Sequence, residues 1–189
     1  NMVTSLLILA GGDGTRLKEI AGNTSKPLVK IRGKHVVTFI IEKMKSELNV
    51  SKIYLLIQEK HYKQYLDYLA TFSSKDLDIE LVVETTKLGT GGAIKNFVQK
   101  CDEKKFYVTN ADTLIKTDIS TFKNAPINSI LCTKLDQNIR FGSIKIDDQY
   151  NIISFDEKKN GSAMIVSTGV YKLHKSVVST IKQDRFDIK

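Results

Sequence analysis

Short apolar runs alternate with amphipathic stretches along the first two thirds of the chain. The run at residues 4–10 is almost wholly apolar and leads into glycines, which is typical of a buried strand. Apolar residues recur at helical spacing over residues 36–48 and predict a helix there. The alternation continues with predicted strands at 52–57, 79–83 and 105–109 and predicted helices at 61–72 and 90–98. This order predicts a parallel sheet with helices on both faces.

The pattern changes after residue 126, where apolar stretches are joined by short polar connections. We interpret these stretches as strands at 129–135, 142–146, 152–155 and 163–171. Asp147, Asp148 and Gln149 form a hairpin-type turn between two of them. The last third should therefore add antiparallel strands. Because the chain has only two prolines and no low-complexity tract, we expect one α/β domain over residues 1–189.

The composition is that of an ordinary globular protein, with 41% hydrophobic and 26% charged residues among 189. The longest apolar run, residues 6–10, is far shorter than the roughly 20 residues that cross a bilayer, so no membrane partner is expected. Cys101 and Cys132 are too few for a disulfide framework or a thiolate zinc site. These features predict a protein of the cytoplasm.

The net charge of +8 first suggests a nucleic-acid partner. Only four of the 29 basic residues are arginines, however, and the lysines are scattered along the chain. Base reading favours arginine and clustered charge, so we expect no nucleic-acid partner. A lysine-rich surface that attracts small polyanions is the simpler interpretation.

The strongest candidate for chemistry is the loop that follows the first strand, Gly11-Gly12-Asp13-Gly14-Thr15-Arg16. Its glycines let backbone amides wrap an anion, and the Arg16 guanidinium matches phosphate oxygens. The alternative is a glycine turn chosen only for tightness. A dinucleotide fingerprint is excluded because Leu17 stands where its last glycine would be, and the P-loop pattern does not occur.

Two more segments carry candidate phosphate and metal ligands. Lys26 precedes Pro27 and should therefore be extended, which suits a lysine that reaches back to a phosphate. Asn110-Ala111-Asp112 ends a predicted strand, where a carboxylate can hold Mg²⁺. Taken alone, Lys26 would be an ordinary surface lysine and Asp112 part of an Asx turn.

A glycine-rich segment, residues 89–93, opens the helix predicted at 90–98. Thr90 can cap that helix, and the glycines permit close approach of a flat base or sugar. The alternative is a simple loop with an N-cap. Glu157 and Lys158 follow a later strand and on their own suggest a surface ion pair. His35, His61 and His174 have no ligand or triad spacing and are taken as incidental.

In this order the segments resemble the sugar-phosphate nucleotidylyltransferases over nearly the whole chain. The resemblance rests on the glycine loop with Arg16 and Leu17, on Ser25-Lys26-Pro27-Leu28, and on the strand end at Asp112. Within the family, residues 88–94 look most like the branch that makes GDP-heptose from D-glycero-α-D-manno-heptose 1-phosphate, and uridylyltransferases acting on N-acetylmuramate 1-phosphate carry a similar segment. The family implies a Rossmann-like, GT-A-like α/β fold whose mainly parallel sheet is extended by antiparallel strands.

The resemblance implies a reaction of an NTP with a sugar 1-phosphate, giving an NDP-sugar and pyrophosphate. Arg16, Lys26 and Asp112 would be catalytic, with Asp112 also holding Mg²⁺ as cofactor. The nucleotide, with GTP favoured, would contact Leu9, Ala10, Gly11, Gly12, Asp13, Gly14, Thr15, Glu84, Gly89, Thr90 and Asn110. The sugar phosphate would contact Gly142, Glu157, Lys158, Ser167 and Thr168. Another nucleotide and sugar, a binding protein without turnover, and a homo-oligomer all stay open, although the intact Arg16, Lys26 and Asp112 favour an enzyme.

Some positions depart from the family pattern. Ser25 stands where proline is usual, Ala111 replaces a glycine, Lys159 stands where proline is frequent, and Ser167 replaces an asparagine that contacts sugar. Residues 185–189 resemble the start of a late segment that leads to a second metal-binding aspartate, with Asp187 at a serine position. We therefore expect the chain, cut off there, to lack one carboxylate of its Mg²⁺ site.

Overall fold

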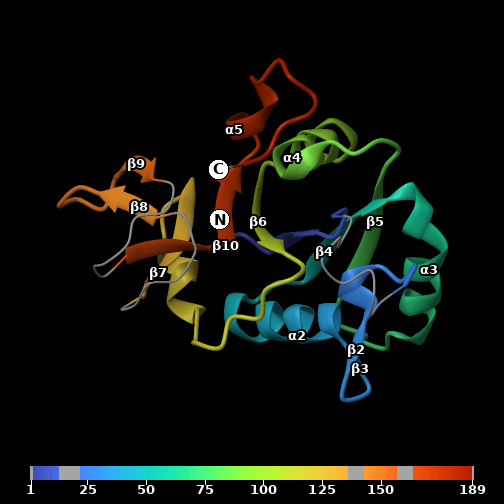
Figure 1. Ribbon diagram of the computed structural model, residues 1–189. Helices are drawn as coiled ribbons and strands as arrows, with labels where there is room; N and C mark the ends of the chain where they lie inside the picture. The colour runs from blue at the N-terminus through green and yellow to red at the C-terminus, as the bar shows by residue number, and fades with distance from the viewer. Residues whose placement is uncertain (1, 13–21, 136–142, 157–163, 189) are drawn as a thin grey trace.

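The computed structural model describes residues 2–12, 22–135, 143–156 and 164–188. Its centre is a sheet in the order β5-β4-β1-β6-β10-β7 (Figure 1). The first four of these strands are parallel: β5 (Asp78–Glu84), β4 (Lys52–Gln58), β1 (Ser5–Leu9) and β6 (Lys105–Asn110). After Ser5, β1 is an uninterrupted apolar run because strands on both sides and helices above and below leave it no polar face.

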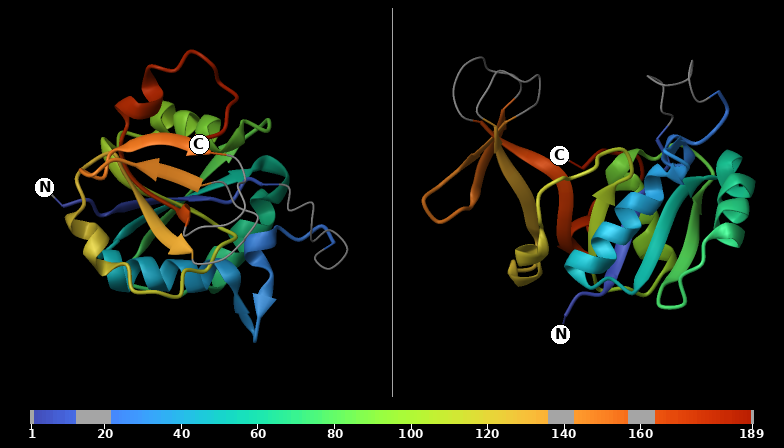
Figure 2. Two further views of the ribbon diagram at one scale, coloured as in Figure 1. Left: turned by 60° about the vertical axis from the view of Figure 1, so that its left-hand side comes forward. Right: turned by 90° about the horizontal axis from the view of Figure 1, so that it is seen from below.

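The last third adds the antiparallel strands, as the sequence predicts. β10 (Met164–His174) pairs antiparallel with β6 on one side and with β7 (Ser129–Leu135) on the other. β8 (Ser143–Ile146) and β9 (Ile152–Asp156) form a separate hairpin. The hairpin packs against β10 and lies at the β7 side of the molecule, away from the parallel strands (Figure 2).

Helices cover both faces of the parallel strands, as predicted. α2 (Val36–Leu48) and α3 (Tyr62–Thr71) lie on one face, and α4 (Gly89–Lys100) and the short α5 (Ser176–Ser179) lie on the other (Figure 1). Alternate residues of each strand supply the two cores. Leu6 and Ile8 of β1 belong to the core under α2, whereas Leu7 belongs to the core under α4.

Several short elements fall outside the sequence prediction. A two-stranded ribbon, β2 (Lys30–Ile31) with β3 (Lys34–His35), precedes α2. The described part of the chain also contains three 3₁₀ turns, which are η2 (Lys26–Leu28), η3 (Glu59–His61) and η4 (Ser120–Asn124). These pieces are too short to produce a hydrophobic period in the sequence. The helix predicted at 61–72 begins at Tyr62 in the structure, one residue later than predicted, because His61 is the last residue of η3.

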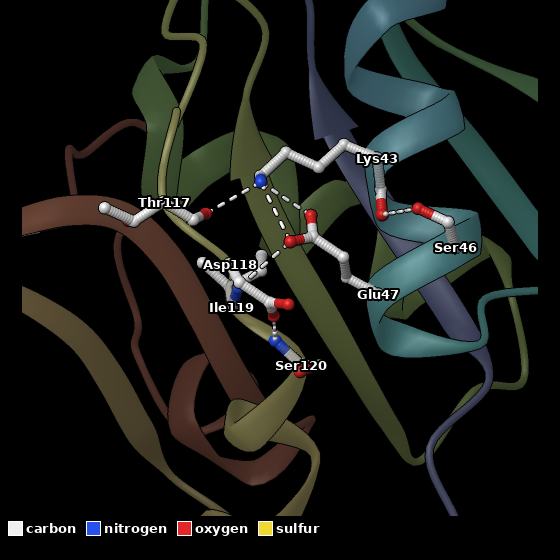
Figure 3. A network of polar contacts seen from close by, with 7 residues as sticks. All are labelled: Lys43, Ser46, Glu47, Thr117, Asp118, Ile119 and Ser120. Atoms are coloured by element: carbon white, nitrogen blue, oxygen red, sulfur yellow. Dashed lines mark hydrogen bonds and ion pairs between the residues drawn. The ribbon is translucent and has the colours of Figure 1, made fainter.

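The chain that leaves β6 is tied to α2 by a small polar network (Figure 3). Lys43 donates to the Thr117 carbonyl at 2.8 Å and pairs with Glu47 at 2.6 Å. Glu47 in turn accepts a hydrogen bond from the backbone N–H of Ile119 at 3.1 Å. Hydrogen bonding by Ser120 holds the pKa of the Asp118 carboxyl below its usual value. The network ties the segment that begins five residues beyond Asp112 to α2.

No helix in the described part of the chain has the length and apolar character needed to span a membrane.

Candidate active site

The strand order changes direction at β1. The chain passes from β1 to β4 and β5 on one side, and then returns to place β6 on the other side of β1. At such a switch point the connections leave a crevice beyond the carboxyl ends of the strands. A cavity of about 230 Å³ lies there, lined by Leu9, Ala10, Gly11, Gly12, Lys26, Pro27, Glu84, Lys87, Gly89, Thr90, Ala93, Asn110, Ala111, Asp112 and Asp187.

The cavity brings together ten of the residues proposed as catalytic or nucleotide-binding from the sequence. They are Leu9, Ala10, Gly11, Gly12, Lys26, Glu84, Gly89, Thr90, Asn110 and Asp112. Arg16, Asp13, Gly14, Thr15, Gly142, Glu157 and Lys158 lie outside the described residues. Lys87 and Asp187, neither of which the sequence assigned to the site, carry the only further charges among the described residues lining the cavity. Lys87 stands two residues before the glycine segment and could have been found by its spacing, whereas the serine position that Asp187 takes in the late family segment gave no reason to assign it to the site.

Lys26 and Asp112 face each other at the mouth of the cavity. The Lys26 Nζ lies 3.9 Å from the Asp112 Oδ2, and both side chains are open to solvent. This separation is at the limit of an ion pair, so the two charges attract each other only weakly in water. A phosphate group that binds between a lysine and a carboxylate-held metal would meet both groups at once.

The position of Lys26 is fixed by α3 through its neighbour Ser25. The buried Ser25 hydroxyl and the Tyr65 hydroxyl are 2.9 Å apart, and the Ser25 N–H donates to Gln64 Oε1 at 2.8 Å. Burial raises the pKa of the Tyr65 phenol well above its usual range, partly opposed by its hydrogen bond with Ser25. Tyr65 therefore stays neutral, and the serine found where the family has proline has a buried hydrogen-bond partner.

The prediction that Lys26 is extended is wrong. Lys26 begins the 3₁₀ turn η2, and the extended residue is Ser25, with φ −56° and ψ 129°. Pro27 is tolerated inside the first turn because the N–H that it lacks has no partner to lose there. Steric restriction before proline disfavours a continued α-helix but leaves room for this short turn.

Gly11, the first residue of the glycine loop, lies beside Glu84, the last residue of β5. A Cβ added to Gly11 would lie 2.5 Å from the Glu84 Oε1, so a larger residue here would have to displace the end of this buried side chain. The Gly11 carbonyl also accepts a hydrogen bond from Gln58 at the end of β4. Three strand ends thus meet around the part of the loop that the structure describes.

The start of α4 is covered by the last described residues of the chain. The Gly92 N–H donates to the Phe186 carbonyl at 2.9 Å, and the Phe186 N–H donates to the Leu88 carbonyl at 2.9 Å. Added Cβ atoms at Gly91 and Gly92 would overlap the Phe186 ring and the Asp184 carbonyl. These two glycines therefore make room for residues 184–188. Packing against residues 184–188, which the sequence did not suggest, explains why positions 91 and 92 are glycines; the expected explanation was the approach of a flat ligand.

The prediction that Thr90 caps α4 is also wrong. Leu88 is the N-cap residue, and Thr90 lies in the first turn. The Asp187 Oδ1 accepts a hydrogen bond from the Thr90 N–H at 3.0 Å, so the cap comes from a residue 97 positions away. The Thr90 hydroxyl instead accepts from the Ile188 N–H at 2.8 Å. A carboxylate at this place also favours the positive end of the helix.

Replacing Asp187 by alanine is expected to lower the free energy of unfolding by about 1 kcal/mol, because α4 loses its N-cap acceptor. Asp187→Asn keeps a side-chain oxygen and should lose only a few tenths of that value. Urea denaturation measures both variants against Asp148→Ala, which removes an exposed carboxylate from a turn. Equal midpoints for Asp187→Ala and Asp148→Ala would contradict the capping role.

Ser167 and Thr168 have their hydroxyls engaged within β10 and β7. The Ser167 Oγ accepts a hydrogen bond from the Gly169 N–H at 3.1 Å. The Thr168 hydroxyl donates to the Leu131 carbonyl at 2.8 Å and accepts from the Val170 N–H at 3.3 Å. Neither residue lines the cavity. Their predicted contact with the sugar phosphate stays a prediction.

The residues present fit a magnesium ion that is held by one protein carboxylate and by the substrate phosphates. Asp112 places one carboxylate at the cavity mouth, and the described residues hold no group of three or more His, Cys, Asp or Glu side chains that could bind a metal. Mg²⁺ is commonly held by one or two carboxylates together with substrate phosphates. This donor set suits an ion that arrives with a nucleotide and takes most of its ligands from it.

The doubly wound sheet and the cavity at its switch point define an α/β protein of the Rossmann-like nucleotide-binding class. The chain matches the family described as nucleotidyl transferase over residues 5–187, and it belongs to that family. This membership confirms the predicted sugar-phosphate nucleotidylyltransferase family, enzyme class and fold.

Known relatives agree with this assignment. The chain is 32% identical over 187 residues to the D-glycero-alpha-D-manno-heptose 1-phosphate guanylyltransferase of Campylobacter jejuni, and the match covers 97% of the chain and 82% of that relative. It is 33% identical over 186 residues to the bifunctional protein GlmU of Methanococcus vannielii, covering 93% of the chain but only 42% of GlmU.

The solved structure of HddC from Yersinia pseudotuberculosis superposes with a TM-score of 0.84 at 31% identity, covering 98% of this chain and 83% of that one. A complex of HddC with GMP-PN superposes with a TM-score of 0.83.

Proposed function

We propose that the protein transfers a guanylyl group from GTP to a heptose 1-phosphate and releases pyrophosphate. The observation that carries the proposal is the placement of Lys26 and Asp112 3.9 Å apart at the mouth of a cavity walled by Gly11 and Gly12. Two polyanionic substrates must be neutralised and aligned, and a lysine, a metal-binding carboxylate and a glycine loop supply those functions.

In the proposed reaction an oxygen of the sugar phosphate attacks the α-phosphorus of the nucleotide in line. The bond from that phosphorus to the bridging oxygen of the β-phosphate breaks, and pyrophosphate leaves with the electron pair. The attacking phosphate is already ionised, so no general base is needed. Lys26 bridges the reacting phosphates and stabilises the charge that develops on them. Mg²⁺ held by Asp112 would supply further neutralisation of the phosphate oxygens.

Guanine is favoured by the charges at the α4 end of the cavity. Glu84 and Asp187 both line this part of the site, and each carboxylate oxygen accepts hydrogen bonds. The Watson–Crick edge of guanine offers adjacent N–H donors, whereas uracil and thymine offer a single one. The names of the Campylobacter guanylyltransferase and of the HddC complex with GMP-PN point the same way.

The reaction is tested by measuring pyrophosphate release with Mg²⁺ over the four NTPs and a panel of sugar 1-phosphates. Release only with GTP and a heptose 1-phosphate is the result we expect. Release with another pair would keep the reaction class and replace the substrates. Nucleotide binding without any release across the panel would instead indicate a binding protein.

Calorimetric titration should show GTP bound about tenfold more tightly than UTP, CTP or dTTP. A hydrogen bond to a charged acceptor contributes about 1.5–3 kcal/mol, which corresponds to at least that factor. ITP is the matched control ligand because it differs from GTP only by the missing 2-amino group. Tighter binding of a pyrimidine nucleotide, or equal binding of ITP and GTP, would contradict recognition of the guanine edge by the carboxylates.

A further inference from the structure

The middle of β10 contains an irregularity that lies against Asn110, a residue of the cavity wall. Its pairing with β7 shifts register between Ser167 and Val170, which marks a β-bulge. The bulge is stabilised by its own side chains, since the Ser167 hydroxyl accepts from the Gly169 N–H and the Thr168 hydroxyl accepts from the Val170 N–H. Gly169 takes a φ of +80°, a conformation that L side chains rarely adopt.

Gly169 lies against the side chain of Asn110. A Cβ built on Gly169 would overlap the Asn110 Nδ2 and lie 3.2 Å from its Cγ and 3.7 Å from its Cβ. The carboxamide therefore occupies the space that any larger residue at position 169 would fill. Only the Cβ of Asn110 would remain at an ordinary contact distance.

Asn110 ends β6 beside Leu9 of β1 and lines the cavity. Its carboxamide makes no hydrogen bond to another residue in the described ranges, so packing holds it in place. A carboxamide offers two donors and an acceptor, and here these face a site built for polar ligands. Its orientation consequently depends on the neighbour that leaves room for it.

We propose that Gly169 is a positioning residue that acts on the nucleotide through Asn110. The left-handed glycine of the bulge leaves the space in which the Asn110 carboxamide turns toward the cavity, where it hydrogen-bonds the bound nucleotide. Ser167 and Thr168 contribute by holding the bulge. This inference rests on the proposed function, since it needs a nucleotide in the cavity.

The test measures GTP affinity and melting temperature for Gly169→Ala, Asn110→Ala and the double variant. Gly169→Ala should weaken GTP binding about tenfold, as expected for a perturbed contact pair. Asn110→Ala should weaken it to a similar extent, and the double variant should match Asn110→Ala within about twofold, because the displaced carboxamide is already gone. Gly33→Ala is the matched control, since Gly33 has φ +79° with nothing within 4 Å of its added Cβ, and it should leave GTP affinity unchanged.

The melting temperatures separate the contact from the conformational strain. Gly169→Ala should lower the melting temperature more than Gly33→Ala does, and its effect should shrink in the Asn110→Ala background. If Gly169→Ala fails to fold, recovery of folding in the double variant supports the inference, and failure of both variants to fold overturns it.

The inference is also overturned if Gly169→Ala binds GTP with wild-type affinity. It is overturned as well if the fold-loss of GTP affinity in the double variant equals the product of the fold-losses in the two single variants. Failure of the proposed function is seen differently, in a wild-type protein that binds none of the nucleotides.

Discussion

Replacing Lys26 by alanine is expected to lower kcat by about a hundredfold or more, the scale found when one preorganised electrostatic donor is removed. The lysine stands 3.9 Å from Asp112 at the cavity mouth, where charge moves onto the leaving pyrophosphate. Because that charge develops mainly in the transition state, kcat should fall more than GTP affinity. Pyrophosphate release at saturating GTP and sugar phosphate measures kcat, and calorimetry measures the affinity.

Lys63→Ala is the matched control for this variant, because Lys63 is an exposed lysine on α3 outside the cavity. It removes the same charge from the molecule and should keep wild-type turnover. Circular dichroism should be unchanged in both variants, since Lys26 makes only a weak, exposed ion pair. A Lys26→Ala enzyme with wild-type kcat would remove Lys26 from the reaction.

Asp112→Asn is expected to have an effect of similar or larger size. The carboxylate is the only candidate metal ligand that the sequence and the described part of the cavity share, and a metal at a phosphoryl centre contributes several kcal/mol. We expect kcat to fall at least about a hundredfold at fixed Mg²⁺ and the Mg²⁺ concentration for half-maximal rate to rise. Steady-state assays over a Mg²⁺ series measure both quantities.

Asp67→Asn serves as the control for the Mg²⁺ series because Asp67 is an exposed carboxylate on α3. An unchanged Mg²⁺ dependence in Asp112→Asn would show that another carboxylate holds the ion. Asp187 also lines the cavity and would be the next residue to replace in the same assay.

The parts of the fold that the sequence predicts are those with a long hydrophobic period. The run in β1 and the helical spacing in α2 each bury a continuous face, so the pattern and the packing coincide. The cavity was likewise predictable, since strand ends such as Asn110 and glycine turns such as Gly11 meet at one edge of a parallel sheet.

What the sequence could not predict depends on contacts between distant positions. The sequence predicts that Gly91 and Gly92 leave room for a ligand, but residues 184–188 occupy that room in the structure. Asp187 became the cap of α4 only because the fold returns the chain to that helix. A glycine indicates that space is needed at its position, but a single sequence does not show which group will occupy that space.

The contact of residues 184–188 with the start of α4 also affects the order in which parts of the protein fold during synthesis. Thr90 and Asp187 are 97 positions apart, so their hydrogen bond closes a very long loop. Contacts of such separation carry a high loop-closure entropy and tend to form after local ones. During synthesis β1, α2 and β4 can assemble while residues 184–188 are still inside the ribosome. The α4 end of the cavity is then completed after these elements, which delays full nucleotide recognition until residues 184–188 have emerged.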